Sequence, residues 1–126
     1  AYACLCNFSK KYMARAKAFV YAACEDFGIA LVEAQACGTP VIAYGAGGAL
    51  ETVRDIRTDA DTGTGILFKM QTVGALVDAV EQFIDHCHLY NYEYIQKHAH
   101  QFSRQVFAER YLGFVNECRE KRLYQK

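Results

Sequence analysis

Three short apolar segments, each followed by a stretch with helical spacing, constrain the fold of this 126-residue chain more than any other feature. Their aromatic and β-branched side chains favour buried strands. The segments are residues 18–22, 41–44 and 65–68. Strands that alternate with helices predict parallel pairing with right-handed crossovers. We therefore expect an α/β fold, a Rossmann-like parallel sheet flanked by helices.

Capping residues predict where several helices begin and end. Ser9 is a candidate N-cap for a helix over Lys10–Lys17, because its hydroxyl can accept from a free amide of the first turn. Gly38 suits the left-handed conformation that closes the helix after the first strand. Thr72 and Ser103 are expected to cap two later helices.

Apolar residues at three- and four-residue spacing predict the inward faces of the later helices. In the helix after Thr72 they are Val73, Leu76, Val77, Val80, Phe83 and Ile84. Further along they are Ile95, Ala99 and Phe102, and then Phe107, Tyr111, Phe114, Val115 and Cys118. We expect these positions to pack in the core or at a domain interface, in a helical C-terminal tail.

Composition and charge exclude several classes of protein. The length fits one domain, residues 1–126, and 52% hydrophobic residues with 22% charged residues indicate a globular chain. Fourteen basic and 14 acidic residues cancel, which argues against a nucleic-acid partner. The six cysteines form no Cys-x-x-Cys pair, so we expect buried thiols and no metal site. The apolar run of residues 2–6 is too short to classify.

The sequence contains neither a run of 18 apolar residues nor a recognisable signal peptide. We therefore expect no transmembrane segment and a cytoplasmic location. The chain does not start with methionine, and we interpret it as a fragment of a longer protein.

Two carboxylates flank the start of the helix after the first strand. In an open parallel sheet, ligands bind at the carboxyl ends of strands beside helix N-termini. There the free N–H groups of residues 28–31 suit a phosphate, and Gly28 lets a ligand approach the backbone. Glu25 in the loop and Glu33 in the helix could accept from sugar hydroxyls. Two such acids alone are more often only surface carboxylates.

A glycine-rich turn at Gly45–Gly48 follows the second strand and opens the next helix. Its backbone is a second candidate nest for anions or hydroxyls. Considered alone, the turn is more often just a tight strand-to-helix connection.

The order of these features resembles the donor-binding segment of glycosyltransferase family 4, the retaining enzymes with the GT-B fold. The matching residues are Glu25, Asp26, Phe27, Gly28, Glu33, Ala34, Ala36, Gly38, Pro40, Val41, Gly47, Gly48 and Glu51. Seven residues separate Glu25 from Glu33, as in the E-x7-E signature of that family. The resemblance covers roughly residues 13–115 and is closest to bacterial polysaccharide and O-antigen mannosyltransferases.

The resemblance implies a C-terminal domain that binds a nucleotide diphosphate sugar, with GDP-mannose as the expected donor and no metal or other cofactor. Glu25 would act at the donor sugar as the catalytic residue, and Glu33 would hold the ribose. The remaining donor-binding residues would be Asp26, Phe27, Gly28, Ile29, Ala30, Leu31, Gly47, Gly48 and Glu51. Amides of residues 27–29 would contact sugar hydroxyls, and those of residues 30–31 the distal phosphate.

The same resemblance implies transfer of a hexosyl, expected to be mannosyl, group to a glycan or lipid-linked acceptor. Attack would come from the front face, with the leaving phosphate taking the acceptor's proton. The family also has an upstream unit with an Arg and a Lys, and an N-terminal acceptor domain, which this sequence lacks. We therefore expect the chain alone to be inactive, and the full-length enzyme could lie peripherally at the inner membrane face. Ala22-Ala23-Cys24 stands where the family has a proline.

Two other classes stay open. A dinucleotide-binding domain would use Gly45-x-Gly47 after its strand, but Leu50 replaces the third small residue of that fingerprint. A non-catalytic nucleotide-binding or scaffold module would need none of this chemistry.

Overall fold

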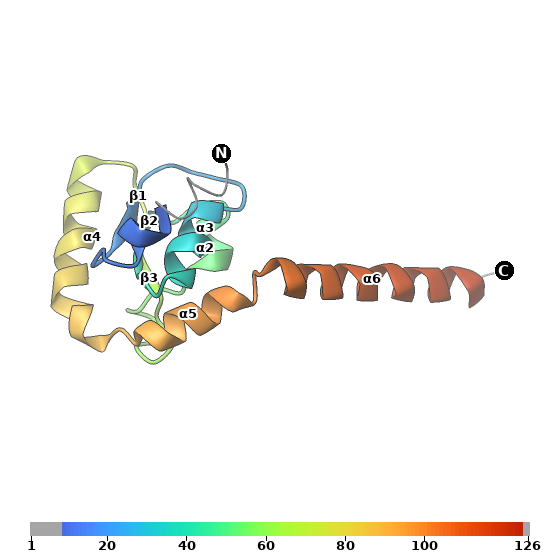
Figure 1. The fold of residues 1–126 in the computed structure, drawn as a ribbon. Helices are drawn as coiled ribbons and strands as arrows, with labels where there is room; N and C mark the ends of the chain where they lie inside the picture. The colour runs from blue at the N-terminus through green and yellow to red at the C-terminus, as the bar shows by residue number, and fades with distance from the viewer. Residues whose placement is uncertain (1–8, 125–126) are drawn as a thin grey trace.

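The computed structural model describes residues 9–124, with side chains described as far as residue 122. Three parallel strands form one sheet in the order β1-β2-β3. The strands are β1 (Phe19–Tyr21), β2 (Val41–Tyr44) and β3 (Gly65–Phe68). The helices are α2 (Ile29–Ala36), α3 (Ala49–Thr52), α4 (Val73–His86), α5 (Tyr92–His100) and α6 (Arg104–Tyr124), with a 3-10 turn, η1, at Cys87–Leu89. The expected α/β class with a parallel sheet and flanking helices is confirmed (Figure 1).

The strand register aligns the three carboxyl ends at one edge of the sheet. Phe19 pairs with Val41, which in turn pairs with Gly65. Gly65 has to be a glycine, because a Cβ there would lie 2.2 Å from the Val41 carbonyl oxygen. The loops after β1 and β2 therefore emerge side by side, where a ligand of a parallel sheet is expected.

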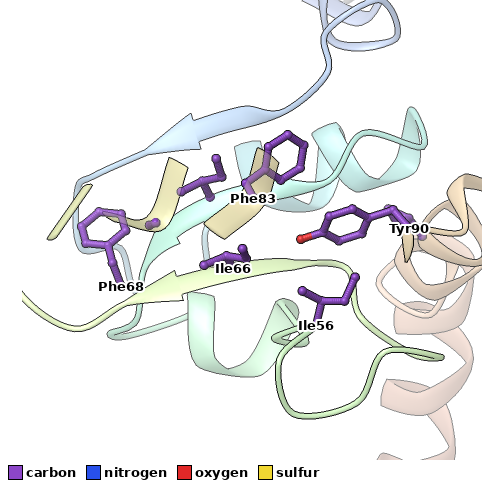
Figure 2. Packing of buried hydrophobic residues seen from close by; sticks show 8 residues of the cluster. Ile56, Ile66, Phe68, Phe83 and Tyr90 are labelled. Atoms are coloured by element: carbon purple, nitrogen blue, oxygen red, sulfur yellow. The ribbon is translucent and has the colours of Figure 1, made fainter. Parts of the chain in front are cut away.

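Successive residues of the strands point to opposite faces, and each face carries its own core. On one face, Ile42 and Ile66 pack with residues of α4 and with Tyr90 (Figure 2). On the other face, Val41 and Ala43 pack with residues of α2 and α3. Figure 1 shows the same layering, with α4 on one side of the sheet and α2 and α3 on the other.

Helix ends follow the capping signals. Gly38 has φ +81°, and the N–H of Thr39 donates to the Ala34 carbonyl at 3.0 Å, which closes α2 with a Schellman motif. The Thr72 hydroxyl accepts from the Ala75 N–H at 3.2 Å and so caps α4. The Ser103 hydroxyl accepts from the N–H of residue 106 at 3.3 Å at the start of α6.

Three local predictions near the N-terminal half are wrong or incomplete. Ser9 is itself helical, and the helical residues end at Met13, four residues before the expected end at Lys17. Among the described strands, β1 lies at an edge of the sheet, and 48% of Val20 is exposed, so this strand is not buried as expected. The apolar run of residues 2–6 lies outside the described residues. α3 ends at Thr52, where the chain leaves the helical conformation at Val53.

The predicted inward faces of two helices are also corrected. On α4, Phe83 is buried, but Val73 and Ile84 are 82% and 60% exposed because they lie on the side of the helix away from the sheet. On α6, Phe107 and Phe114 are 66% and 64% exposed, so they do not pack in the core of this chain, whereas packing at a domain interface stays a prediction. Figure 1 shows the reason, since α6 extends away from the sheet and its other helices. In the part of the chain that the structure describes, no helix is long and apolar enough to cross a bilayer.

Candidate functional site

The loop of residues 22–28, here called the acidic loop, joins β1 to α2 and carries Glu25, Asp26 and Phe27 at the surface. The Tyr21 hydroxyl, at the end of β1, donates a short hydrogen bond to Oε1 of Glu25. This bond to a carboxylate raises the pKa of Tyr21. Among the described residues, Oε2 of Glu25 has no hydrogen-bond partner, so it can accept from a ligand hydroxyl.

The start of α2 offers free backbone donors directly after the acidic loop. Gly28 adopts the left-handed conformation, with φ +79° and ψ +57°, which turns the chain into the helix. Its carbonyl accepts from the N–H of Leu31 at 3.0 Å, so the Leu31 amide, predicted to be free, is used inside the helix. The N–H groups of Gly28, Ile29 and Ala30 have no acceptor in the described part of the chain. Three amides at a helix start form an anion-binding end.

The glycine turn, Gly45–Gly48, lies against the acidic loop. The Gly48 N–H donates to the Glu25 carbonyl at 2.7 Å. A Cβ at Gly47 would lie 2.2 Å from the Glu25 carbonyl oxygen, and one at Gly48 would lie 2.2 Å from that of Phe27. Both positions therefore require glycine so that the two backbones can touch.

This contact corrects the interpretation of the glycine turn as an open anion nest. The N–H of Gly45 donates to the Phe68 carbonyl at 2.8 Å, and that of Ala46 to the Tyr44 carbonyl at 2.9 Å. With the Gly48 amide bound to Glu25, three of the four amides of the turn have protein acceptors. The glycine turn supports the acidic loop and keeps one amide without an acceptor among the described residues, that of Gly47, whereas three such amides lie together at the start of α2.

Each of the two loops is followed by a helix that carries an exposed glutamate. Glu33 lies on the second turn of α2 and Glu51 in the first turn of α3, and both are exposed. The structure brings Glu25, Asp26, Phe27, Gly47 and Gly48 into one unit through the contacts above. That Glu25 and Glu33 bind one ligand together stays a prediction.

A pocket of about 410 Å3 with both polar and apolar lining residues lies beside Gly45, where β2 and β3 end. Arg57 in its wall donates to the Asp55 carboxylate, to Gln82 at 2.6 Å and to the Leu67 carbonyl at 2.7 Å. Burial alone would raise the pKa of Asp55, but the hydrogen bonds from Arg57 and Leu67 outweigh it and lower that pKa. Arg57 is therefore a structural cation, and Lys69 is an exposed cation of this wall.

Two contacts of the acidic loop were not predicted from the sequence. Alternation along the first strand places Tyr21 on the same face as Phe19. The separation of only four residues between Tyr21 and Glu25 could have indicated the hydrogen bond between them. The contact between Phe27 and Phe102 joins residues far apart in the sequence, so no local pattern could indicate it. No cluster of three or more His, Cys, Asp or Glu side chains suited to a metal occurs among the described residues.

A parallel sheet with an amide-rich helix start and acidic residues at its carboxyl edge defines an α/β domain of the type that binds nucleotides and phosphorylated ligands. Comparison with protein families identifies its relatives more closely. Residues 8–104 match the family Glycosyl transferases group 1, and the chain belongs to this family.

Individual relatives match over a shorter stretch. The chain is 47% identical over 60 residues to D-inositol 3-phosphate glycosyltransferase of Mycobacterium leprae, covering 48% of this chain and 13% of that protein. It is 43% identical over 63 residues to the Mycobacterium tuberculosis protein of the same name, covering 50% of this chain and 12% of that protein. The chain thus spans about an eighth of the length of these curated relatives.

Among solved structures, sucrose-phosphate synthase from Thermosynechococcus elongatus is similar to this chain. The two share 32% sequence identity, and the match has a TM-score of 0.46. It covers 78% of this chain and 27% of that chain.

Proposed function

We propose that this chain is the donor-binding domain of a retaining glycosyltransferase, which moves a hexosyl group from a nucleoside diphosphate sugar to a glycan or lipid-linked acceptor. The observation that carries the proposal is the set of three free amides at the start of α2, next to an exposed carboxylate held in place by Tyr21. Membership of the glycosyl transferases group 1 family supports the same reaction class.

Each part of the site has a chemical task in this proposal. Because the Leu31 amide is used inside the helix, we assign the amides of Gly28 and Ile29, expected above at the sugar hydroxyls, to the diphosphate together with that of Ala30. These three amides offset the negative charge of the diphosphate, which grows as the sugar leaves. Glu25, with Oε2 available, accepts from a hydroxyl of the donor sugar near the reacting carbon. Glu33 accepts from the ribose hydroxyls. Of the other predicted residues, Asp26, Phe27, Gly47, Gly48 and Glu51 support or line the same edge, whereas the Leu31 amide is used inside α2.

We further propose a mannosyl donor, GDP-mannose, for which the resemblance to polysaccharide mannosyltransferases is the support. No metal or redox cofactor is part of this proposal. A titration panel separates the two halves of the donor. GDP-mannose compared with GDP reports on the sugar, and GDP-mannose compared with a UDP-hexose reports on the base.

Isothermal titration of the 126-residue chain with GDP-mannose tests the proposal. Glu33→Ala removes a charged acceptor of two hydroxyls, and hydrogen bonds to charged groups contribute about 1.5–3 kcal/mol, so affinity should fall roughly ten- to a hundredfold. Glu81→Ala is the matched control, because Glu81 is an exposed glutamate on α4, in another layer of the fold.

NAD serves as the competitor of a different class. A dinucleotide-binding domain would prefer NAD, whereas a scaffold module would bind neither compound. Three of the four amides of the glycine turn have protein acceptors, which favours the sugar nucleotide over the dinucleotide. Equal affinity for both compounds, or an equal loss in Glu33→Ala and Glu81→Ala, would refute the proposed function.

A further inference from the structure

The turn after α5 reaches the acidic loop through an aromatic contact. The ring of Phe102 lies edge-on to that of Phe27, with centroids 6.0 Å apart and an interplanar angle of 75°. Phe102 is half-buried, whereas 43% of Phe27 is exposed. Edge-to-face pairs at this distance are attractive beyond the area that they bury. The ring of Phe27, in the middle of the acidic loop, is thus tied to a residue 75 positions further along the chain.

Phe102 is itself held by a buried histidine. The His98 ring lies edge-on to Phe102 with centroids 5.7 Å apart, and only 7% of His98 is exposed. His98 Nε2 lies 3.1 Å from the Thr52 carbonyl, and Nδ1 lies 3.0 Å from the Gln101 side-chain amide nitrogen. A neutral ring that donates through Nε2 and accepts at Nδ1 satisfies both partners. His98 therefore links the end of α3 to the turn after α5, which carries Phe102.

The acidic loop is attached to the rest of the fold at several points, among them the Ala22 carbonyl, which accepts from the Gln71 side chain at 2.8 Å. Its backbone contacts the glycine turn, through the hydrogen bond from the Gly48 N–H to the Glu25 carbonyl. Its only aromatic side chain contacts Phe102. Glu25 lies two residues before Phe27, so the contact with Phe102 fixes the part of the loop that directly follows its carboxylate.

We propose that Phe102, fixed by His98, is a positioning residue that holds the acidic loop in its donor-binding form. Phe102 acts through Phe27 and through the amide at Gly28 that follows it, and it touches no ligand. Only the expected effect of Phe102 on donor affinity rests on the proposed function. The hold on the loop itself can be measured without any ligand.

The reporter is hydrogen exchange of the Gly48 amide, relative to that of Val41. The Gly48 N–H is protected by the Glu25 carbonyl of the acidic loop, at 2.7 Å. The Val41 N–H is protected by the Thr64 carbonyl within the sheet, at 3.1 Å. Global unfolding accelerates both amides, whereas release of the acidic loop accelerates Gly48 alone. The ratio of the two rates therefore separates positioning from a general loss of stability.

The experiment compares Phe102→Leu with Phe83→Leu by exchange monitored with NMR. Phe83 is a matched control, because it is a core phenylalanine on α4 that pairs with Tyr90 at 5.5 Å, on the α4 face of the sheet. Loss of an aromatic pair corresponds to a roughly two- to tenfold change, so the Gly48-to-Val41 ratio should rise by that factor in Phe102→Leu. Phe102→Tyr keeps the ring and should restore the ratio. Phe83→Leu should leave it unchanged.

A GDP-mannose titration of the same variants adds the functional consequence. Weaker binding by a similar factor in Phe102→Leu, with none in Phe83→Leu at a temperature where both are folded, supports the proposal. Equal donor affinity in Phe102→Leu and the wild type, or an unchanged exchange ratio, would overturn it. If the wild-type chain binds no sugar nucleotide, the proposed function fails, and the exchange ratio still decides whether Phe102 holds the loop.

Discussion

Replacing Gly48 with alanine tests how closely the glycine turn and the acidic loop are fitted together. Gly48 has φ −62° and ψ −20°, a conformation that alanine adopts without strain. The obstacle is space, because the new Cβ would lie 2.2 Å from the carbonyl oxygen of Phe27 and 2.4 Å from its Cα. Backbone atoms have to move apart to make room, so the acidic loop should shift away from α3.

The size of the effect follows from three contributions. Overpacking a close contact costs about 1–3 kcal/mol. A weakened hydrogen bond from Gly48 to Glu25 adds about 1 kcal/mol. The lower entropy of an unfolded chain with alanine offsets about 0.4–1 kcal/mol. We expect a net loss of about 2 kcal/mol in the free energy of unfolding, and a Tm lower by roughly 6–10 °C.

Gly74→Ala is the control for the same chemical change. Gly74 lies in the first turn of α4, and a Cβ there would meet no atom within 4 Å. Alanine should stabilise this helix by up to about 1 kcal/mol. Urea unfolding followed by circular dichroism measures both variants. If Gly48→Ala is as stable as Gly74→Ala and binds GDP-mannose like the wild type, the argument that the two loops form one unit is refuted.

Three further predictions concern the core and a helix cap. Tyr90→Phe should raise the unfolding free energy by about 1 kcal/mol, because the buried Tyr90 hydroxyl has no hydrogen-bond partner among the described residues; a less stable variant in urea titration would contradict this. Thr72→Ala should cost about 1 kcal/mol by removing the cap of α4, with Thr72→Ser as the variant that keeps stability in the same assay. Burial lowers the pKa of His98, so the unfolded chain takes up its proton first, and stability should fall as the pH drops below about 6.5 towards the folded pKa. His98→Gln should flatten this slope between pH 7 and 5.5, and an unchanged slope would show that His98 is not its source.

Much of the fold could be predicted from local patterns. The runs at Val41–Tyr44 and Gly65–Phe68 gave the bounds of β2 and β3 because each is short, apolar and bounded by Pro40, Gly45 or polar residues. The glycine after α2 and the threonine before α4 predicted their helix ends correctly, since capping depends on neighbouring residues alone.

The wrong predictions arise where a pattern shows an apolar face but not its partner. The spacing of Phe107, Tyr111 and Phe114 is that of an amphipathic helix, and it contains no information about whether the helix lies on its own domain. Ser9 could accept from an amide wherever a helix starts behind it, but the helix already includes it.

The sequence predicted which residues form the candidate site, but not which of them contact one another. Glu25, Gly28 and the glycine turn were identified from the sequence, and the structure places them at one edge of the sheet. That the Gly48 amide is used by Glu25, and that Phe102 reaches Phe27, depend on pairs far apart in the chain. Such contacts are set by the packing of helices on the sheet, which no local spacing encodes.

The central claim is that the free amides at the start of α2 bind the diphosphate of a sugar nucleotide. An NMR titration of the 15N-labelled chain with GDP-mannose tests it most directly. The amide signals of Gly28, Ile29 and Ala30 should move furthest, with smaller changes along the acidic loop and none in α4. Unchanged signals at these three amides, while the largest changes occur around the pocket beside Arg57 and Lys69 or elsewhere, would contradict it.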